Sequence, residues 1–499
     1  MTSTVLIIGS GPTGATYARQ LLGAVPDVAV LMVEAGPVVS DPPGMNVKNI
    51  ADPAAQAAAR LASQGSATES GVSGIPGGVV VEGTITARQG TFLIGDAADG
   101  SPGMPAAAAS SCVGGQGVHW TCATPRPAGS ERISFIGPHE WDEHITEAER
   151  LLHTTRAAFG DSPQAAAILE LLGKEFAPDG IAVRPLPVAA DPRPDGTLRW
   201  SGTDVVLAPV LDDPRFTLRA ETLCVRLLRT GDRVTGAVLR DQRSGTEQEV
   251  HADAVVVAAD AIRTPQLLWA SGIRPEALGR YLTEHPLLFG VVALREGAVP
   301  PRTGTVAPVD PIQAVVAIGY DEEKHPYHAQ IMFSPICPVP LPEGSPHRDN
   351  PAGYAGMGWG VRKWPRPQDR LIFADDQPDR NGLPGIRIAY ELTEREQAEL
   401  DRARQHQARA AAALGSFVEG MPKVMPAGSS LHYMGTVRMG PADDGTSVCD
   451  SWSRVWGVPG LVLAGNGLIP TANSCNPTLT SVAIAVRGAA ALAAELTSR

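Results

Sequence analysis

The sequence predicts an α/β fold with two domains, the first assembled from both ends of the chain and the second inserted between them. Residues 4–36 have the pattern of a short apolar strand, a helix and a second buried strand, which is typical of a β-α-β unit. Residues 461–464 and 477–496 have the pattern of one more buried strand and an apolar helix. Between these ends, the Pro-rich residues 280–360 carry short apolar runs, which indicates an inserted α+β domain built on an antiparallel sheet with long loops.

The individual elements follow from hydrophobic periodicity and from turn-forming residues. Residues 38–103 are dominated by Ala, Ser, Gly and Pro, so we expect long loops and a few short elements there. Thr393 and Glu396 form a capping box that opens a helix with a solvated charged face. The predicted strands lie at residues 5–8, 28–33, 216–220, 223–228, 233–240, 248–252, 254–259 and 461–464, and the predicted helices at 14–22, 139–159, 164–176, 393–414 and 477–496.

The composition of the chain excludes several classes of partner. Its 41 Lys and Arg residues against 53 Asp and Glu give a net charge of −12 without any basic run, so nucleic acid is not an expected partner. No basic leader precedes the first strand, and no apolar stretch is expected to span a membrane, so we predict a soluble, cytoplasmic protein. Six scattered cysteines without a CxxC pair predict reduced thiols and no metal site.

A glycine fingerprint follows the first predicted strand. Gly9, Gly11 and Gly14 form a GxGxxG in which glycines permit a tight turn and a close approach of the backbone to a pyrophosphate. Glu34 ends the next strand, where a carboxylate can bind a ribose 2′-OH, so the unit predicts a Rossmann-like dinucleotide site and argues against NADP. The fingerprint leaves NAD and FAD open, and the late GNG turn at residues 465–467 favours the longer FAD.

A histidine and an asparagine near the C-terminus are the catalytic candidates. His432 is either a core histidine or a general base, since a neutral imidazole can take a proton near neutral pH. Asn476 precedes Pro477, and this pair is typical of a helix start, so we expect Asn476 to be the N-cap of the last helix. Because the free N–H groups of a helix start favour negative charge, the two residues predict hydride chemistry on an alcohol.

Several motifs together resemble the glucose–methanol–choline (GMC) flavin oxidoreductases, and among them the pyranose oxidase branch. The motifs are GSGPTG at residues 9–14, SSCVGGQGVHWTCATP at 110–125, DAIRTPQLL at 260–268, GRYLTEHP at 279–286, LHYMGTVRMG at 431–440 and SRVWGVPGLVLAGNGLIPTANSCNPTLT at 453–480. The resemblance covers both ends of the chain and these internal landmarks. It implies a GMC-type, Rossmann-like FAD-binding domain that is discontinuous in sequence.

The resemblance also implies roles for single residues. His432 and Asn476 would be the catalytic pair, and Thr121 would contact the flavin. His119 would carry FAD through a covalent bond, but GGQGVHW here replaces the usual GGMSTHW, so covalent and non-covalent contact both remain open. His285 is expected to stabilise a turn. The implied cofactor-binding residues are Gly9, Gly11, Gly14, Glu34, Gly115, His119, Thr121, Cys224, Asn466, Gly467, Pro477 and Thr478.

The implied function is FAD-dependent oxidation of a secondary ring hydroxyl, at C2 or C3, of a pyranose sugar or glycoside, with O2 or a quinone as the electron acceptor. A quinone-dependent dehydrogenase of the same fold, an oxidase of a non-sugar alcohol and an NAD-dependent alcohol dehydrogenase are the alternatives. A homo-oligomer remains open. The expected domain ranges are 1–40, 104–130, 200–285 and 430–499 for FAD, 41–103 for loops and lid-like segments, and 131–199 and 286–429 for the substrate.

Overall fold

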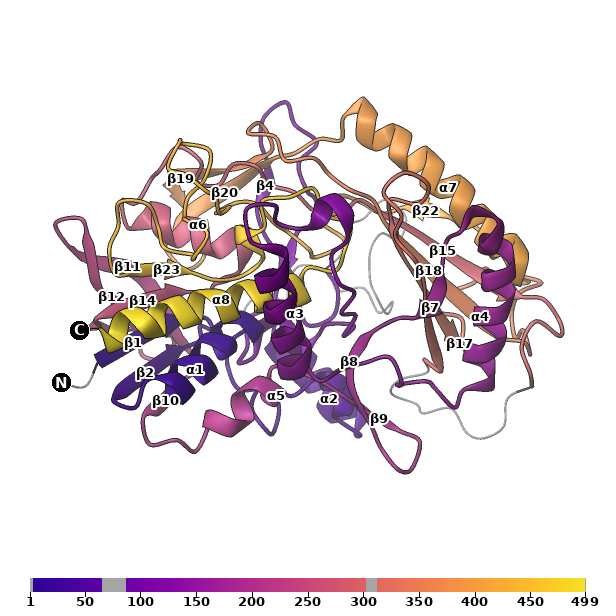
Figure 1. Ribbon diagram of the computed structural model, residues 1–499, viewed down its shortest axis with the longest axis horizontal. Coiled ribbons are helices and arrows are strands. Elements are labelled where there is room, and N and C mark those ends of the chain that lie inside the picture. The colour runs from indigo at the N-terminus through magenta and orange to yellow at the C-terminus, as the bar shows by residue number, and fades with distance from the viewer. Residues whose placement is uncertain (1–2, 65–86, 302–311, 499) are drawn as a thin grey trace.

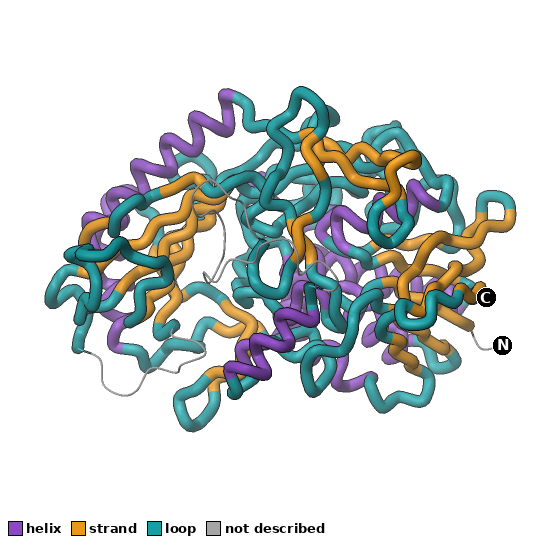
Figure 2. The backbone as a smooth tube through the Cα atoms, turned by 180° about the vertical axis from the view of Figure 1, so that it is seen from behind, coloured by secondary structure: helices purple, strands orange, loops and turns teal. Residues whose placement is uncertain are grey.

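The computed structural model describes residues 3–64, 87–301 and 312–498, which form two parts that lie side by side (Figure 1). One part holds both ends of the chain. Seen from behind, the two groups of strands lie on opposite sides with many loops between them (Figure 2). The helices are α1 (Pro12–Ala24), α2 (Pro53–Ala62), α3 (Pro138–Leu152), α4 (Pro163–Phe176), α5 (Asp204–Leu207), α6 (Asp260–Ala270), α7 (Glu394–Leu414) and α8 (Thr478–Thr497).

A five-stranded parallel sheet forms the core of the first part. Four of its strands are almost continuously apolar, as expected where both faces of a parallel sheet are covered, whereas the edge strand at residues 216–219 alternates apolar and polar residues. In the central strand, Ile8 pairs with Val33 on one side and with Val257 on the other. Segments from both ends and from the middle of the chain therefore share one sheet, which confirms the predicted discontinuous α/β fold. The strand order is β10 (Phe216–Arg219), β2 (Val28–Val33), β1 (Ser3–Ile8), β14 (Ala254–Val257) and β23 (Leu461–Leu463).

An antiparallel sheet forms the core of the inserted part and confirms the predicted architecture. Helices α4 and α7 pack against it. The backbone N–H of Thr393 donates to Oε2 of Glu396 over 2.7 Å at the start of α7, so the predicted capping box is also confirmed. The main strand order is β21 (Gly415–Phe417), β15 (Leu287–Leu294), β18 (Tyr354–Gly360), β17 (His328–Ser334), β16 (Ala314–Ile318) and β7 (Val183–Pro185), and β22 (Lys423–Val424) pairs with β15.

Smaller sheets complete the described part of the chain. One of them confirms the three strands predicted between residues 223 and 252, and its strand β12 packs against β14. The smaller sheets are β11 (Thr222–Thr230), β12 (Arg233–Asp241) and β13 (Glu247–His251); β19 (Arg370–Pro378), β20 (Pro384–Ala389) and β4 (Asp96–Ala97); β3 (Phe92–Leu93) and β5 (Ala108–Ala109); and β6 (Thr154–Thr155), β8 (Val188–Pro192) and β9 (Leu198–Trp200).

Helix α8 corrects one expectation. By length and composition it could cross a membrane, although the sequence was expected to contain no such stretch. However, 78% of its apolar window is buried inside the protein, where α8 packs against α1 and α3 (Figure 1). Arg487 on this helix is also buried, and its Nε lies 2.7 Å from Oε1 of Glu140 on α3. The apolar composition of α8 is therefore explained by packing in the protein core.

Two boundaries differ from the sequence prediction. The helix predicted over residues 139–159 ends at Leu152, because His153 takes a left-handed φ of 57°. The same helix, α3, lies in a range predicted for the substrate domain but shares the core of the parallel sheet with α8. The other domain ranges stay predictions. Residues 65–86 of the predicted loop region lie outside the described residues.

Candidate active site

A cavity of about 590 Å³ brings together most of the residues that the sequence singled out. Gly14, Gly467 and Pro477 are not part of its wall. A Cβ on Gly14 would lie 2.1 Å from the carbonyl oxygen of Gly9, so Gly14 permits close packing behind the wall instead. The predicted residues that line the cavity are Gly9, Gly11, Glu34, Gly115, His119, Thr121, Cys224, His432, Asn476, Asn466 and Thr478.

The glycine turn between β1 and α1 forms one region of the cavity wall. Gly9 has φ of +103°, and a Cβ there would lie 2.3 Å from the carbonyl oxygen of Ala258, so only glycine is tolerated. A Cβ on Gly11 would meet no atom within 4 Å, because Gly11 faces the open cavity. Gly11 is also the N-cap of α1, whose first N–H groups lie nearby and favour negative charge. The turn therefore has the geometry of an anion cradle.

Glu34 lies next to this turn at the end of β2. Its Oε2 accepts a hydrogen bond from the Ser10 hydroxyl over 2.8 Å, and its Oε1 accepts one from the backbone N–H of Gly36 over 3.1 Å. Burial raises the pKa of Glu34, although these hydrogen bonds lower it in part. The carboxylate is thus fixed in the cavity wall, where a ribose hydroxyl could donate to it.

His119 lies in the cavity wall as a neutral imidazole. Burial, followed by the charge of Arg60, lowers its pKa to about 4. Its Nε2 is 4.0 Å from Sγ of Cys112, and its ring packs so closely on Gly90 that a Cβ there would lie 2.6 Å from it. Thr121 lines the same cavity two residues further along. The ring is therefore held in one place and keeps a nucleophilic nitrogen.

Cys224 and Asn466 also line the cavity. Burial raises the pKa of the Cys224 thiol to about 12, so this side chain is a neutral packing group on β11. The side-chain oxygen of Asn466 accepts a hydrogen bond from the hydroxyl of Ser481 on α8. This bond joins the GNG turn to the last helix, and both line the cavity.

His432 lies opposite a second histidine that the sequence prediction had assigned to a turn. Nδ1 of His432 is 2.6 Å from Nε2 of His285, and the two rings are nearly perpendicular. Burial, then the charges of His285 and Arg88, hold the pKa of His432 well below its usual range. Burial also lowers the pKa of His285 to about 4. His285, which was expected to stabilise a turn, thus also contacts the catalytic candidate directly.

Asn476 does not cap the last helix, contrary to the sequence prediction. Helix α8 begins at Thr478, and its N-cap is Pro477, whose φ of −81° and ψ of −11° are already helical. The side-chain oxygen of Asn476 instead accepts a hydrogen bond from Nε2 of Gln330 on β17. Asn476 is buried and lines the cavity together with His432. The inserted sheet therefore supplies the residue that orients the amide of Asn476.

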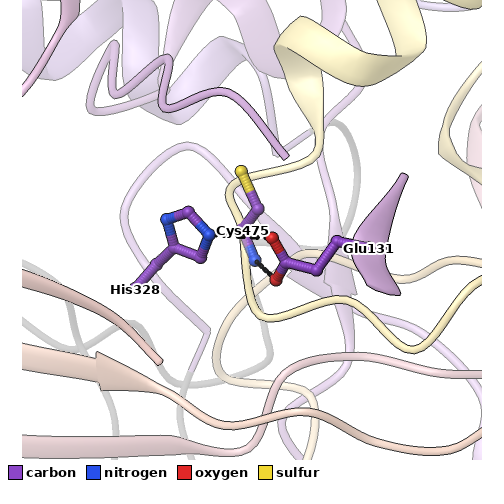
Figure 3. A group of neighbouring side chains, drawn as sticks. All are labelled: Glu131, His328 and Cys475. Atoms are coloured by element: carbon purple, nitrogen blue, oxygen red, sulfur yellow. Dashed lines mark hydrogen bonds and ion pairs between the residues drawn. The ribbon is translucent and has the colours of Figure 1, made fainter. Parts of the chain in front are cut away.

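Glu131, His328 and Cys475 form a cluster (Figure 3), in which Glu131 and Cys475 are buried and His328 is partly buried, and Cys475 directly precedes Asn476 in the chain. Oε1 of Glu131 accepts hydrogen bonds from the backbone N–H groups of Ser474, over 2.8 Å, and Cys475, over 3.2 Å. Its Oε2 lies 2.8 Å from Nε2 of His328 on β17. Three potential ligand atoms lie within 4.8 Å of one another here, but the Cys475 thiol donates to the carbonyl of Pro125 over 3.1 Å. The cluster is therefore explained as a structural clamp on the segment that carries Asn476.

Two further ionisable groups lie close to His432. The guanidinium of Arg88 lines the cavity and donates to the carbonyl of Ser429. Glu284 accepts a hydrogen bond from the Ser430 hydroxyl over 2.6 Å, and that hydroxyl accepts one from the backbone N–H of His432 over 3.1 Å. Burial raises the pKa of Glu284 to about 7. The sequence prediction had given neither residue a role.

Comparisons of the sequence with known proteins identify the family of this chain. Residues 190–287 and 372–485 match the family described as GMC oxidoreductase. The C-glycoside 3-oxidase of Microbacterium trichothecenolyticum is 45% identical, with 99% of this chain and 97% of the relative covered. The C-glycoside 3-oxidase of Arthrobacter globiformis is 44% identical, with 99% of this chain and 95% of the relative covered. The pyranose 2-oxidase of Tricholoma matsutake is 30% identical, with 99% of this chain and 94% of the relative covered.

Two solved structures share the fold at low sequence identity. The formate oxidase of Aspergillus oryzae RIB40 has a TM-score of 0.70 at 16% identity, with 99% of each chain covered. The pyridoxine 4-oxidase of Mesorbium loti has a TM-score of 0.68 at 19% identity, covering 98% of this chain and 99% of that chain. The discontinuous parallel sheet, the glycine turn and the near-full-length relatives agree with one another, and the chain belongs to the GMC oxidoreductase family.

Proposed function

We propose that this chain is an FAD-dependent oxidase that converts the C3 hydroxyl of a pyranose ring, in a C-glycoside or a related glycoside, to a ketone. The observation that carries the proposal is the pair of His432 and Asn476 in one cavity with the glycine turn at Gly9 and Gly11. The choice of C3 is supported by the names of the relatives at 44–45% identity, whereas the pyranose 2-oxidase is 30% identical.

The residues of the cavity fit FAD. The space beside Gly11 that a Cβ would occupy is open, and the start of α1 offers N–H groups for a pyrophosphate. Glu34 would accept a hydrogen bond from a ribose hydroxyl. His119 and Thr121 would lie against the flavin, and the first turn of α8, which reaches the cavity at Thr478, would favour negative charge on it.

In alcohol oxidation the hydroxyl loses a proton and its carbon loses a hydride, and His432 is the residue that would take the proton. When bound, FAD would accept the hydride from the carbon that carries the hydroxyl. Nδ1 of His432 is engaged by His285, so Nε2 is the nitrogen that takes the hydroxyl proton. The lowered pKa of His432 keeps it in the neutral, proton-accepting form. A positioned base of this kind contributes roughly 10²–10⁴-fold to a rate.

Asn476 would hold the oxygen that loses the proton. Its side-chain oxygen accepts from Gln330, so its NH₂ group is left to donate to the substrate. A donor aimed at an oxygen that gains negative charge stabilises the transition state more than the ground state. We propose O2 as the electron acceptor, with H2O2 as its product, because the relatives are named oxidases.

One experiment tests the substrate and the position of oxidation. The purified enzyme is mixed without oxygen with C-glycosides, O-glycosides and free sugars, and the loss of flavin absorbance is followed. We expect C-glycosides to bleach the flavin fastest and NMR of the product to show a ketone at C3. A C2 ketone, or bleaching by non-sugar alcohols alone, would contradict the proposal. Peroxide yield in air against dye reduction under nitrogen distinguishes an oxidase from a quinone-linked dehydrogenase.

The bond between His119 and FAD is tested separately. A neutral imidazole in the cavity wall suits both a covalent bond and a simple contact. Acid precipitation of the pure protein distinguishes them, because a covalent flavin stays in the pellet and a free one stays in the supernatant. The cytoplasmic location and a homo-oligomer stay predictions.

A further inference from the structure

We propose that His285 is a positioning residue for His432. His285 accepts a hydrogen bond from Nδ1 of His432 and so fixes the tautomer in which Nε2 of His432 keeps a lone pair for the substrate. The inference rests on the proposed function, in which His432 acts as the base. It adds a residue from the GRYLTEHP motif that the sequence prediction had assigned to a turn.

The backbone places the two histidines opposite each other. Thr283 and Met434 form an antiparallel bridge in which each backbone N–H donates to the other's carbonyl, over 3.0 and 2.8 Å. In an antiparallel pair, a residue two positions after Thr283 lies across from a residue two positions before Met434. These residues are His285 and His432, and their ring nitrogens are 2.6 Å apart. The contact is therefore built into the pairing of the two chain segments.

The direction of this hydrogen bond decides whether His432 can act as a base. If His432 donates from Nδ1, its Nε2 carries a lone pair and can take a proton. If His285 donates instead, Nε2 of His432 carries the proton and cannot take another. His285 lies beside the carbonyl of Ser474, an acceptor that favours a proton on its ring, and its Nδ1 is the ring nitrogen that does not face His432. A proton on Nδ1 of His285 leaves its Nε2 as the acceptor, so the first arrangement is favoured.

Burial, followed by the charges of nearby groups, lowers the pKa of both rings and keeps them neutral, although Glu131 raises the pKa of His285 in part. His285 faces His328 and Glu131, and His432 faces Arg88, which in turn interacts with Glu284. An imidazole acceptor fixes a tautomer without adding the negative charge that a carboxylate would add, so it does not raise the proton affinity of His432. The role of His285 resembles that of the aspartate in a Ser-His-Asp triad, which holds the catalytic histidine in the correct tautomer. Loss of that tautomer in the triad slows the reaction by orders of magnitude.

The tautomer is tested on the flavin-loaded enzyme without any substrate. Nitrogen-15 NMR of histidine-labelled protein distinguishes the two neutral forms, and the signals of His432 are assigned by their absence in His432→Ala. We expect His432 to carry its proton on Nδ1 in the native enzyme, and the His285→Leu variant to lose this preference. A proton on Nε2 of native His432, or an unchanged spectrum of His432 in His285→Leu, would overturn the proposal. Neither result depends on which substrate is oxidised.

Three variants at His285 then separate positioning from packing. In His285→Leu, which has no acceptor, we expect anaerobic flavin reduction to slow roughly 100-fold with little change in KM. In His285→Gln, whose amide oxygen can accept, the rate should stay within about tenfold of the native rate. In His285→Asp, the carboxylate should shift the acid limb of the pH profile to higher pH. Equal rates in the Leu and Gln variants, or equal pH profiles in the Leu and Asp variants, would show a packing role only.

Discussion

Oε2 of Glu131 lies 2.8 Å from Nε2 of His328, and this largely buried pair joins the segment that carries Cys475 and Asn476 to strand β17 of the inserted sheet (Figure 3). Strand β17 also carries Gln330, two residues after His328 and on the same face of the strand, and Gln330 binds the side chain of Asn476. Glu131 thus fixes the backbone of the segment that carries Asn476, and β17 fixes the orientation of its amide. The site depends on contacts between the two parts of the molecule.

Replacing Glu131 by alanine should strongly destabilise the protein. The change leaves His328 and the N–H groups of Ser474 and Cys475 without their acceptor, and breaking a buried pair from one side costs about 3–5 kcal/mol. Chemical denaturation measures this loss. The matched control is Glu170→Ala, which removes an exposed, solvent-screened pair with Lys174 and should leave the stability almost unchanged. Equal losses in the two variants would contradict the clamp. Burial alone would raise the pKa of Glu131, but the charge and hydrogen bond of His328, together with hydrogen bonds from Ala128 and Ser474, lower it below its usual value. The contribution of this carboxylate to stability should therefore be lost as pH falls below 4.5.

The contribution of Glu284 to stability should depend on pH in the opposite direction to that of Glu131. Burial raises its pKa from 4.5 to about 7, against the hydrogen bonds from Ser430 and Gly428. The folded protein then holds this proton more tightly than the unfolded chain, so the contribution is complete below pH 4.5 and is lost as pH rises through about 7. The loss amounts to about 3 kcal/mol. In Glu284→Gln, the unfolding free energy should fall less than in the native protein between pH 5 and 8, and parallel curves would contradict the raised pKa.

The sequence predicts the scaffold well because the signals for it are local. The strands of the parallel sheet are short apolar runs between turns, and the glycine turn after β1 has a fixed spacing, so both can be recognised in a short window. His432 is recognised in the same way, from the motif around it. These features depend on residues that are neighbours in the chain.

The contacts that complete the site join residues that are far apart in the chain. His285 and His432 are separated by 147 positions, and Glu131 and Ser474 by 343. No local pattern encodes the antiparallel bridge that makes His285 face His432. The N-cap prediction for Asn476 was wrong for the same reason, because Gln330 from the inserted sheet takes its side chain.

Removing the imidazole of His432 should strongly slow reduction of the flavin by substrate without loss of FAD. His432→Ala should keep the flavin spectrum of the native enzyme, while anaerobic reduction by a glycoside slows by roughly 10²–10⁴-fold. Stopped-flow absorbance measures both. His139→Ala is the control, because this histidine lies on α3 with 91% of its side chain exposed and should react at the native rate. Reduction of His432→Ala at the native rate would refute the assignment of the base.

The hydrogen bond from Gln330 to Asn476 should affect the rate of substrate oxidation. In Gln330→Ala the amide of Asn476 can rotate and present its oxygen to the substrate, and the loss of one neutral hydrogen bond costs about 1 kcal/mol, which is roughly fivefold in rate. Gln330→Glu places two acceptors face to face and should lose more. Steady-state kinetics of both variants test this order, and a Glu variant as active as the native enzyme would show that Gln330 does not orient Asn476.

The open space beside Gly11 gives a direct test of cofactor binding. The backbone of Gly11, with φ of −64° and ψ of 177°, accepts any residue, and a Cβ there would project into the cavity without meeting another atom. Gly11→Val should therefore fold but occupy the space that FAD needs, so the purified protein should contain much less flavin per chain. Gly23 near the end of α1 is the matched control, because a Cβ there also meets no atom but faces solvent. Gly23→Val should keep its flavin. If purified Gly11→Val contained as much flavin per chain as the native protein, the cofactor would have to bind elsewhere.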